Sequence, residues 1–448
     1  MSKHYDIIII GGGNAGLGVS AVAAEAGKSI AFIEGRDFGG TCPNRGCTPK
    51  KVLVAAGHTL HEIERAQAHG IRVNEPTLDW THLIDRAQDM ISFIPDAIAG
   101  VAEKRGDVYR GFARFTGPDS VEVNGEVLTA DHIVIATGSK PRALPIPGAE
   151  LMITSDEVLS ERAQPQEVIF VGGGVIALEF AHVYQRAGTQ VTILEVMPQL
   201  LPRLETDAVA QLRAETERLG VRVHTGVSVS SIDADGDRLA VNVEIDGKPQ
   251  RLVADRVVNG AGRVANVDSL DLDAAGVEHD GVAIALDKTL RSVSNPRVYV
   301  AGDALVQSPQ LSPLATWEGR IVGENIVNAA GIEPDYQVVP SVVHTVPSLA
   351  TVGLSEAEAE AEGRDVEVSV NDMTGWFSGK SYAETVAWSK VLVDRSTDEI
   401  VGAHLVGHRA EELVHIFGLA MQHGISATKL RTTQFAFPTF SSDVKNLF

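Results

Sequence analysis

The only two cysteines of the chain, Cys42 and Cys47, lie in the stretch GGTCPNRGCTPK, residues 39–50. Two thiols so close together can be half of a metal site, two small hydrophobic side chains, or a redox pair. A four-thiolate zinc site needs two more cysteines, and a Cys2His2 site completed by His58 and His61 requires the loop to fold as a zinc knuckle. A structural disulfide is disfavoured in a reducing compartment. The motifs in the rest of the sequence distinguish between these alternatives.

The composition excludes several classes of partner. The chain has 448 residues, of which 44% are hydrophobic, and a net charge of -21. This excess of acidic residues argues against nucleic acid or an anionic membrane as the main partner. No apolar run reaches the length of a membrane span, and the four isoleucines at residues 7–10 lead into glycines rather than a signal-peptide cleavage site. We therefore expect a cytoplasmic protein.

The segment YDIIIIGGGNAGLGVSAVAAEAGKSIAFIEG predicts a strand, a turn, a helix and a second strand. The apolar run at residues 7–10 is typical of a strand buried on both faces of a parallel sheet. Gly11, Gly13 and Gly16 have the G-x-G-x-x-G spacing, which brings the backbone and a helix N-terminus up to a pyrophosphate. Glu34 ends the second strand, where an acid can accept hydrogen bonds from ribose hydroxyls. The segment predicts a dinucleotide site.

The same pattern recurs in EVIFVGGGVIALEFAHVYQRAGTQVTILEV, with Gly172, Gly174, Ala177 and then Glu195. Two such segments in one chain predict two different dinucleotides, one held tightly and one exchanged. An acid at Glu195 favours a free ribose diol and repels a 2′-phosphate, which predicts NADH over NADPH. Arg203, a few residues further on, would soften that preference.

Further strand-to-turn segments suggest a flavin-type architecture. HIVIATGSKPRALPIPG is a strand that ends in Ala136, Thr137 and Gly138, and RVVNGAGRVAN repeats this form near Gly260. RVYVAGDA places Asp303 after a buried strand and a glycine, a position suited to hydrogen bonding a polyol chain. Each segment alone is a simple turn, but their combination with two glycine loops points to bound FAD.

GGTCPNRGCTPKK resembles the redox-active disulfide motif of the class I pyridine nucleotide–disulfide oxidoreductases, the family of glutathione reductase, dihydrolipoamide dehydrogenase and mercuric reductase. The resemblance covers essentially the whole chain. It implies FAD on the first domain, NAD(P)H on the second, and a disulfide against the flavin. By position, Cys47 would be the flavin-side charge-transfer thiol and Cys42 the interchange thiol, while Lys50 and Glu179 match an ion pair near the flavin. The resemblance also implies cofactor contacts at Thr41, Gly262, Leu314, Ala315 and His344.

The chemistry of a thiol pair agrees with this resemblance. In such a family, hydride passes from the nicotinamide to the flavin, and two electrons then pass to the disulfide. The thiolate is the reactive form, and a pair at a helix start beside a lysine has lowered pKa values.

The C-terminal segment FAFPTFSSDVKNLF departs from the family pattern. The family has His-Pro-Thr-x-x-Glu, which protonates the leaving thiolate; here Phe437 replaces the histidine, Pro438 and Thr439 are kept, and Ser442 replaces the glutamate. Loss of a positioned general acid costs about 10²–10⁴-fold in rate. Ordinary disulfide turnover is therefore expected to be slow unless another group substitutes. His344 is one candidate, although we interpret it as a structural histidine.

Several alternatives remain open. Mercuric reductase also lacks the dyad and has a similar tail, but it ends in a cysteine pair, whereas this chain ends in Leu447 and Phe448. In 2-ketopropyl-coenzyme M oxidoreductase/carboxylase, a phenylalanine also replaces the histidine, which makes reductive C–S cleavage without protonation an alternative. A redox sensor and a diaphorase that reduces quinones or metals are the others.

The fold class we predict is α/β, with two Rossmann-like domains for FAD and NAD(P) and a C-terminal α+β dimerisation domain. The expected boundaries are 1–145 for the first FAD part, 146–264 for NAD(P), 265–335 for a central FAD-side segment and 336–448 for the C-terminal domain. VEVSV, WSKVLVD and EIVGAHLVG are its expected strands. We predict a homodimeric, NADH-preferring FAD enzyme that acts on a small disulfide or other sulfur substrate.

Overall fold

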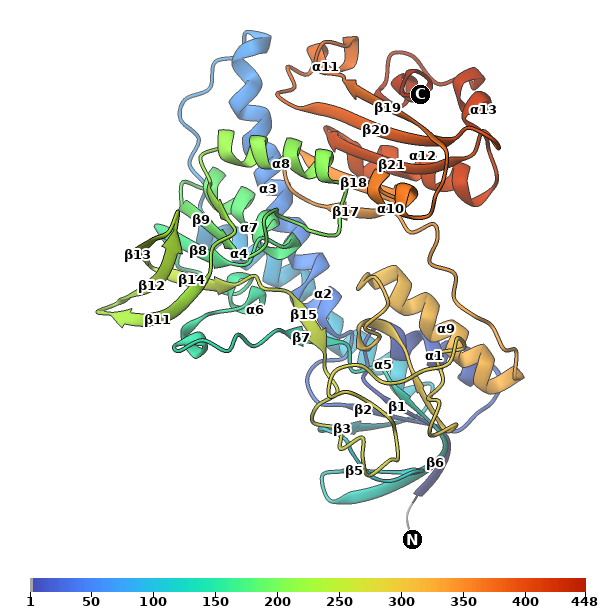
Figure 1. Ribbon diagram of the computed structural model, residues 1–448. Helices are drawn as coiled ribbons and strands as arrows, with labels where there is room; N and C mark the ends of the chain where they lie inside the picture. The colour runs from blue at the N-terminus through green and yellow to red at the C-terminus, as the bar shows by residue number, and fades with distance from the viewer. Residues whose placement is uncertain (1–2) are drawn as a thin grey trace. The chain divides into compact units, whose positions relative to one another are not determined.

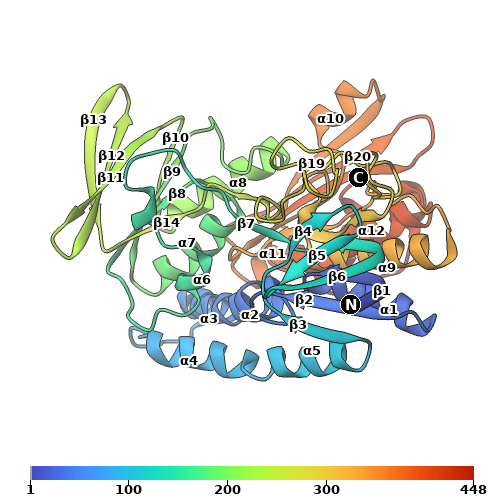
Figure 2. The same ribbon diagram turned by 90° about the horizontal axis from the view of Figure 1, so that it is seen from below.

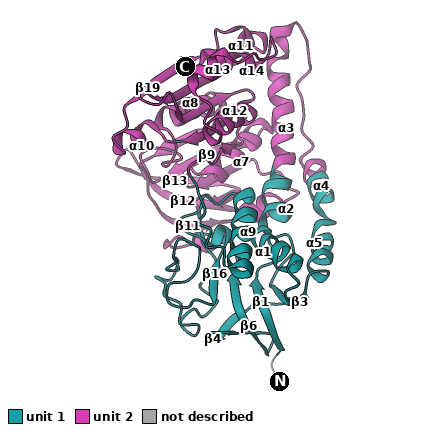
Figure 3. Ribbon diagram, turned by 90° about the vertical axis from the view of Figure 1, so that its right-hand side faces the viewer, with its two compact units in different colours: residues 1–50, 86–142, 263–336 teal, residues 51–85, 143–262, 337–448 magenta. Residues whose placement is uncertain are grey.

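The computed structural model describes residues 3–448 and contains two compact units (Figure 3). Unit 1 consists of residues 1–50, 86–142 and 263–336, and unit 2 of residues 51–85, 143–262 and 337–448. Each unit is thus assembled from three separate stretches of the chain.

Unit 1 is built around a seven-stranded sheet with the order β3-β2-β1-β6-β5-β4, in which β16 also pairs with β6. Strands β3, β2, β1, β6 and β16 are parallel, whereas β4 and β5 are antiparallel. The strands are β1 (Lys3–Ile10), β2 (Ile30–Glu34), β3 (Asp107–Arg110), β4 (Arg114–Gly117), β5 (Ser120–Val123), β6 (Glu126–Ile135) and β16 (Val298–Val300). A separate pair is formed by β7 (Ser139–Pro141) and β15 (Arg263–Ala265).

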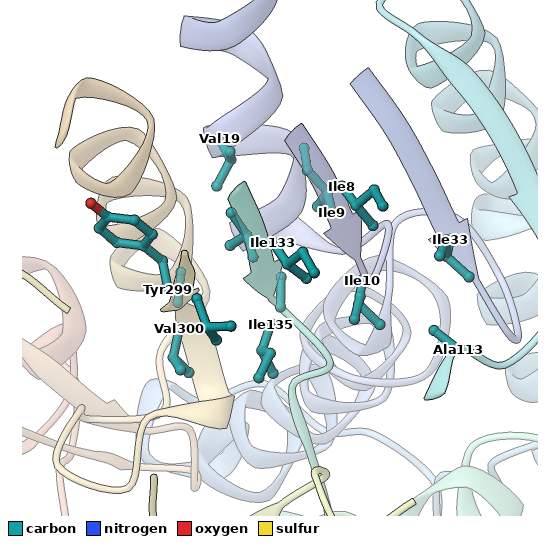
Figure 4. Close-up of a cluster of buried hydrophobic side chains, with 14 of the residues drawn as sticks. Ile8, Ile9, Ile10, Val19, Ile33, Ala113, Ile133, Ile135, Tyr299 and Val300 are labelled. Atoms are coloured by element: carbon teal, nitrogen blue, oxygen red, sulfur yellow. The ribbon is translucent and has the colours of Figure 1, made fainter. Parts of the chain in front are cut away.

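The isoleucine run at residues 7–10 forms the centre of this sheet. It pairs with residues 30–33 on one side and residues 132–135 on the other. Ile7, Ile8 and Ile9 are fully buried, which confirms the prediction of a parallel strand covered on both faces. Figure 4 shows how the side chains of β1 lie among those of Val19, Ile33, Ile133, Ile135, Tyr299 and Val300. Each such side chain contributes about 1.5–3 kcal/mol on burial.

Helices α1 (Asn14–Glu25) and α9 (Ser312–Asn328) lie side by side in unit 1 (Figure 1). Glycines make their close contact possible. A Cβ on Gly319 would lie 2.1 Å from the carbonyl oxygen of Ala15, and a Cβ on Gly18 would lie 2.4 Å from that of Thr316. The two helix backbones are therefore in direct contact. Unit 1 also contains α2 (Thr41–Arg45) and α5 (Ile94–Glu103), whereas α3 (Cys47–Arg65) and α4 (Trp80–Ile91) each have residues in both units.

Unit 2 contains a second parallel sheet with the order β10-β9-β8-β14, which repeats the arrangement β3-β2-β1-β6 of unit 1. A three-stranded antiparallel sheet, β11-β12-β13, is inserted in the sequence between β10 and β14 (Figure 2). The elements are α6 (Ser155–Val158), β8 (Glu167–Val171), α7 (Val175–Arg186), β9 (Gln190–Glu195), α8 (Thr206–Arg218), β10 (Arg222–Thr225), β11 (Val229–Asp235), β12 (Arg238–Ile245), β13 (Lys248–Ala254) and β14 (Arg256–Asn259). The second glycine loop thus belongs to a second Rossmann-like fold, as predicted.

The C-terminal part of unit 2 is a five-stranded antiparallel sheet with the order β17-β18-β21-β20-β19. Its core is formed by side chains of β18, β20 and β21 packed against α12. The elements are β17 (Ser341–Val343), β18 (Ser348–Gly353), α10 (Glu356–Ala361), β19 (Val366–Asp372), α11 (Phe377–Ser381), β20 (Ala387–Asp394), β21 (Ile400–Gly407), α12 (Ala410–Gln422), α13 (Ala427–Thr432) and α14 (Phe440–Asp443). All three strands predicted for this region are present, and the α+β class is confirmed. Within residues 3–448, no helix combines the length and the apolar character that crossing a bilayer requires.

A buried lysine ties the C-terminal sheet to α8. Lys390 of β20 is 2% exposed, and its Nζ lies 2.8 Å from Glu205, 2.5 Å from Asp207 and 2.6 Å from Glu356. Glu205 precedes α8 and Glu356 opens α10. The three carboxylates therefore hold the lysine ammonium, and the lysine joins three elements of unit 2.

A buried histidine makes a second tie in unit 2. His182 of α7 is 1% exposed, and its Nε2 lies 2.9 Å from the hydroxyl of Thr216 in α8, which donates to the carbonyl of Leu212. Its Nδ1 accepts the backbone N–H of Val346 at 3.3 Å. Burial and the neighbouring Arg186 guanidinium lower the pKa of His182 to about 3. The imidazole is thus neutral in the folded protein.

His182 makes the protein less stable in mild acid. The unfolded histidine takes up a proton below about pH 6.5, whereas the folded one stays neutral, so the stability is present above pH 6.5 and lost as the pH falls. At pH 5 the loss from this residue is about 2 kcal/mol. We expect His182→Gln to reduce the difference in unfolding free energy between pH 7.5 and pH 5 by about this amount, measured by urea unfolding of the holoprotein.

The exposed His423 provides the matched control for this measurement. His423→Gln should leave the difference between the two pH values as it is in the parent. An unchanged difference in His182→Gln would contradict the assignment of a neutral, buried imidazole.

Candidate active site

The first glycine loop connects β1 to α1 in unit 1. Gly11 has a φ of +114°, a conformation that favours glycine, and a Cβ on Gly16 would lie 2.1 Å from the carbonyl oxygen of Gly11. Gly13 is the N-cap of α1, and no side chain caps that helix. The first backbone N–H groups of α1 are therefore available to an anion such as a pyrophosphate.

Glu34, at the end of β2, is fixed beside this loop. Its Oε2 accepts the backbone N–H of Gly12 at 2.8 Å, and its Oε1 accepts that of Arg36 at 2.7 Å. The carboxylate keeps further lone pairs that can accept ribose hydroxyls. The predicted partnership of glycine loop and acid is thus present in the structure.

Unit 2 contains a second glycine loop with a glutamate fixed beside it. Gly172 has a φ of +106°, and a Cβ there would lie 2.4 Å from the backbone of Gly260. Gly174 is the N-cap of α7, and Ala177 is fully buried in its first turns. Glu195 is 7% exposed; its Oε2 accepts the N–H of Gly173 at 2.5 Å and its Oε1 accepts that of Met197 at 2.7 Å. The geometry matches that of Glu34.

The other predicted flavin contacts of unit 1 lie at the ends of β6 and β16. Among residues 3–448, the buried hydroxyl oxygen of Thr137 has no hydrogen-bond partner, which fits a ligand group at this position. Asp303 follows β16, and its carboxylate accepts the hydroxyl of Ser139 at 3.1 Å. Burial raises the pKa of Asp303. A hydroxyl-rich chain would supply partners to both side chains, so these residues fit FAD.

The remaining predicted cofactor positions are distributed over both units. Gly138 has a φ of +68° and Gly262 a φ of +95°. Thr41 is the first residue of α2, and Leu314 and Ala315 lie in the first turn of α9. Their contacts with a cofactor remain predictions.

Cys42 lies in α2 and Cys47 opens α3, and both are free thiols. The turn into α2 needs glycine, because Gly39 and Gly40 have φ values of +99° and +68°. The N–H of Gly39 donates to the carbonyl of Gly12 at 2.9 Å. The cysteine loop is therefore tethered directly to the first glycine loop.

The two thiols affect each other's pKa values in opposite directions. Hydrogen bonds from the Cys47 thiol and the Ser312 hydroxyl lower the pKa of Cys42 to about 6, against the opposing effects of burial and Asp303. The hydrogen bond to Cys42 and burial raise the pKa of Cys47, while Lys50 opposes the rise. The lowered pKa of Cys42 favours its thiolate, the form that attacks sulfur or accepts electrons.

Glu179 and His344 are brought together in unit 2. Glu179 of α7 is 5% exposed, and its Oε1 accepts the backbone N–H of His344 at 2.7 Å. The imidazole Nδ1 of His344 lies 3.2 Å from Nζ of Lys51. Lys50 belongs to unit 1 and Glu179 to unit 2, so their predicted ion pair remains a prediction.

The C-terminal segment presents an exposed aromatic ring and a buried serine hydroxyl. Phe437 is 78% exposed, and its ring centroid lies 6.4 Å from that of Phe377. The hydroxyl of Ser442 is buried and donates to the carbonyl of Thr439 at 2.6 Å, while the Ser442 N–H bonds the Thr439 hydroxyl at 3.1 Å. Ser442 therefore serves the cap of α14.

The structure also contains a carboxylate–histidine pair that sequence reasoning missed. Nδ1 of His408 lies 3.2 Å from Oε1 of the fully buried Glu384. The rings of Tyr382 and Phe440 lie 5.0 Å from the His408 ring. Burial lowers the pKa of His408 to about 4. The imidazole is therefore neutral at physiological pH and packs as a structural group.

Two dinucleotide-type folds and a thiolate-bearing cysteine pair at the first glycine loop define a flavin- and nicotinamide-dependent oxidoreductase class. Residues 5–319 match the model of the pyridine nucleotide-disulphide oxidoreductase family, and residues 339–448 match its dimerisation domain. The chain belongs to the pyridine nucleotide-disulphide oxidoreductase family. This family uses FAD and NAD(P)H, in agreement with the two glycine loops.

Relatives cover nearly the whole chain. It is 34% identical to a dihydrolipoyl dehydrogenase of Thermus scotoductus, over 98% of this chain and 95% of the relative. It is 30% identical to a mercuric reductase of Staphylococcus aureus, over 98% of this chain and 81% of the relative. A solved structure of the HOCl-induced flavoprotein disulfide reductase RclA from Escherichia coli, a Cu(II) complex, has 26% identity and a TM-score of 0.88 over 100% of this chain and 99% of that one.

The role of the first glycine loop in flavin binding can be tested by adding one methyl group to it. In Gly16→Ala the new Cβ meets the carbonyl of Gly11 in a backbone that has no room to move, a clash of the kind that typically costs about 1–3 kcal/mol. We expect the purified variant to show a lower flavin-to-protein absorbance ratio and a lower Tm.

Gly100 of α5 is the matched control, because a Cβ there meets nothing within 4 Å. Gly100→Ala should keep its flavin and gain about 0.5–1 kcal/mol in stability. Full flavin content in Gly16→Ala would contradict a cofactor seated on this loop.

Proposed function

We propose that this enzyme passes electrons from NADH through FAD to the Cys42–Cys47 pair, and from there to a disulfide or another sulfur substrate. The observation that carries the proposal is the pair of free thiols, a half-buried Cys42 and an exposed Cys47, in a loop that the hydrogen bond from Gly39 to Gly12 tethers to the first glycine loop. Bound FAD supplies the conversion of a hydride into an electron pair for the disulfide. The residues named above position the thiols for this exchange.

In the proposed reaction, Cys42 is the nucleophile and Cys47 the resolving thiol. The Cys42 thiolate forms a bond to one substrate sulfur and expels the other as a thiolate. Cys47 then loses its proton, forms the Cys42–Cys47 disulfide and releases the first substrate sulfur. The dithiol loses two electrons, and the two product thiols take up the Cys47 proton and one proton from solvent.

The C-terminal segment restricts the substrate class. Because Phe437 cannot donate a proton and the Ser442 hydroxyl is held by Thr439, the leaving thiolate departs unprotonated. We propose that the preferred substrate has a leaving sulfur that is stable as an anion. The match of residues 339–448 to the dimerisation domain supports a homodimer. We propose that it is a cytoplasmic enzyme in which the exposed Phe437 makes the substrate site more apolar.

NADH is the proposed electron donor. Glu195 is buried beside the second glycine loop with its carboxylate fixed by two backbone N–H groups. Such a fixed negative charge accepts a ribose diol and repels a 2′-phosphate. The next two residues, Val196 and Met197, are exposed and apolar and offer a phosphate no positive charge.

A second candidate is the reduction of a metal ion or quinone. Two similar proteins are a mercuric reductase and a reductase solved as a Cu(II) complex. Such acceptors need no proton on a leaving sulfur, which fits the C-terminal segment.

The Cys42→Ser variant separates the two candidates. We expect anaerobic NADH titration of the parent enzyme to give a long-wavelength charge-transfer band and two new thiols. Cys42→Ser should lose reduction of an aromatic disulfide by at least about 10³-fold while it keeps NADH-dependent quinone reduction. Flavin bleaching without new thiols in the parent would favour the metal or quinone reductase instead.

The coenzyme preference can be tested by neutralising one carboxylate. Glu195→Gln keeps one acceptor for the loop and removes the charge, so we expect the ratio of kcat/KM for NADPH over NADH to rise about tenfold, or about 1.4 kcal/mol. Arg203→Ala, at an exposed position, is the companion variant and should lower NADPH use if Arg203 assists it. A higher kcat/KM of the parent enzyme for NADPH than for NADH would contradict the proposal.

A further inference from the structure

A buried carboxylate in α9 fixes the turn that carries Asp303. Glu318 is fully buried and lies in the second turn of α9, in unit 1. Its Oε2 accepts the backbone N–H of Gly302 at 2.9 Å. Its Oε1 accepts the hydroxyls of Ser308 at 2.5 Å and of Tyr336 at 2.7 Å. One side chain therefore joins α9 to three other segments of unit 1.

The N–H of Gly302 is bonded by this side chain at the point where the chain leaves the sheet. Strand β16 ends at Val300, and the N–H of the next residue, Ala301, still donates to the carbonyl of Ile135 at 3.0 Å. Gly302 then turns away with a φ of +72°. A buried N–H without an acceptor is costly, so the Glu318 carboxylate determines the position of this turn.

The side chain of Asp303 is fixed separately. Its Oδ2 accepts the hydroxyl of Ser139 in β7 at 3.1 Å. Nε of Arg263 donates to the same hydroxyl oxygen at 2.9 Å, so the Ser139 proton points to Asp303. Asp303 is thus held through its carboxylate by Ser139 and through the preceding residue by Glu318. An ionised carboxylate has about four acceptor positions, which leaves capacity for the hydroxyls of a ligand.

A second observation points to a ligand at this end of the sheet. Strands β6 and β16 are neighbours, with Ile135 paired to Val300. Thr137 follows β6 just as Asp303 follows β16, and its hydroxyl oxygen is buried without a hydrogen-bond partner among residues 3–448. A hydroxyl-rich chain that lies across both strand ends would bond both side chains.

The contacts of Glu318 depend on its shape more than on its charge. The three donors are neutral groups. Burial raises the pKa of Glu318, and the hydrogen bonds from these donors oppose the rise. A glutamine has nearly the same shape: its oxygen can face the N–H of Gly302, and its NH2 group can donate to the two hydroxyl oxygens.

We propose that Glu318 is a positioning residue for the flavin, which holds the turn at Gly302 so that the Asp303 carboxylate meets the polyol chain of FAD. The inference rests on the proposed function, because it starts from the predicted contact between Asp303 and FAD. Glu318 acts on the cofactor only through Asp303.

The test measures how fast the holoenzyme releases its FAD. The holoenzyme is diluted, and free flavin is separated by ultrafiltration at successive times. In Glu318→Ala the Gly302 N–H loses its acceptor, and we expect FAD release to become at least about tenfold faster. Glu318→Gln, which keeps an acceptor oxygen, should release FAD at nearly the parent rate.

Glu324 provides the matched control on the same helix, because its carboxylate accepts the side chain of Asn328 at the surface. Glu324→Ala should release FAD at the parent rate. An unchanged rate in Glu318→Ala, or an equal acceleration in Glu324→Ala, would overturn the inference.

A double-mutant cycle separates positioning from a general loss of stability. Because Glu318 acts through Asp303, Glu318→Ala should accelerate FAD release by less than about twofold in the background of Asp303→Ala. Additive effects of the two substitutions, or an unchanged rate in Asp303→Ala, would contradict the inference. If Glu318→Ala yields no holoenzyme, Ser308→Ala combined with Tyr336→Phe removes both hydroxyls from Oε1. This double variant should then release FAD faster than the parent, and the same cycle decides.

The two proposals fail in different ways. If the enzyme reduces no sulfur substrate, the release rate still reports whether Glu318 positions the FAD site. If the release rate does not depend on Glu318 while Cys42→Ser abolishes disulfide reduction, the proposed function stands without this residue.

Discussion

The direct contact between the backbones of α1 and α9 is the constraint on which the candidate active site depends. Because Gly18 and Gly319 have no Cβ, the two helices approach until carbonyl oxygens lie where side chains would otherwise be. This contact brings the first residues of both helices together and places Ser312 beside the glycine loop. The cysteine loop is then fixed to the same loop by a backbone hydrogen bond. A side chain at Gly18 or Gly319 would push α1 and α9 apart and so separate Asn14 from Ser312.

The two dinucleotide folds share their local design but differ in what surrounds them. In both, a glutamate at the end of the second strand accepts the N–H of the middle glycine. Unit 2 adds buried polar ties around its copy, through His182 to α8 and through Lys390 to the C-terminal sheet. A buried charge or imidazole is costly unless it is paired, so these ties favour one arrangement of the elements within unit 2.

The electrostatics of the site follow from neutral donors rather than from acids. The neighbouring Cys47 lowers the pKa of the Cys42 thiol, while burial and the negative charge of Asp303 oppose this effect. Near the C-terminus, the Phe437 side chain has no acidic proton to donate, and the Ser442 hydroxyl donates to the carbonyl of Thr439 at the cap of α14. In the proposed function, such a site favours the nucleophilic thiolate of Cys42 and leaves the expelled sulfur without a proton donor from Phe437 or Ser442.

The sequence by itself determined the features that depend on local spacing. The isoleucine run, both glycine loops, their glutamates and the C-terminal strands were predicted because a strand, a tight turn and a helix start each require particular residues within a few positions. The tertiary structure decided which side chains meet. Asn14 and Ser312 are 298 residues apart, and Glu384 and His408 meet from two separate connecting segments, before β20 and after β21, so no local pattern signals either contact. The role of the Ser442 hydroxyl likewise depends on the tertiary structure. A serine hydroxyl can cap a helix or donate to a substrate, and the backbone around Ser442 selects the helix cap.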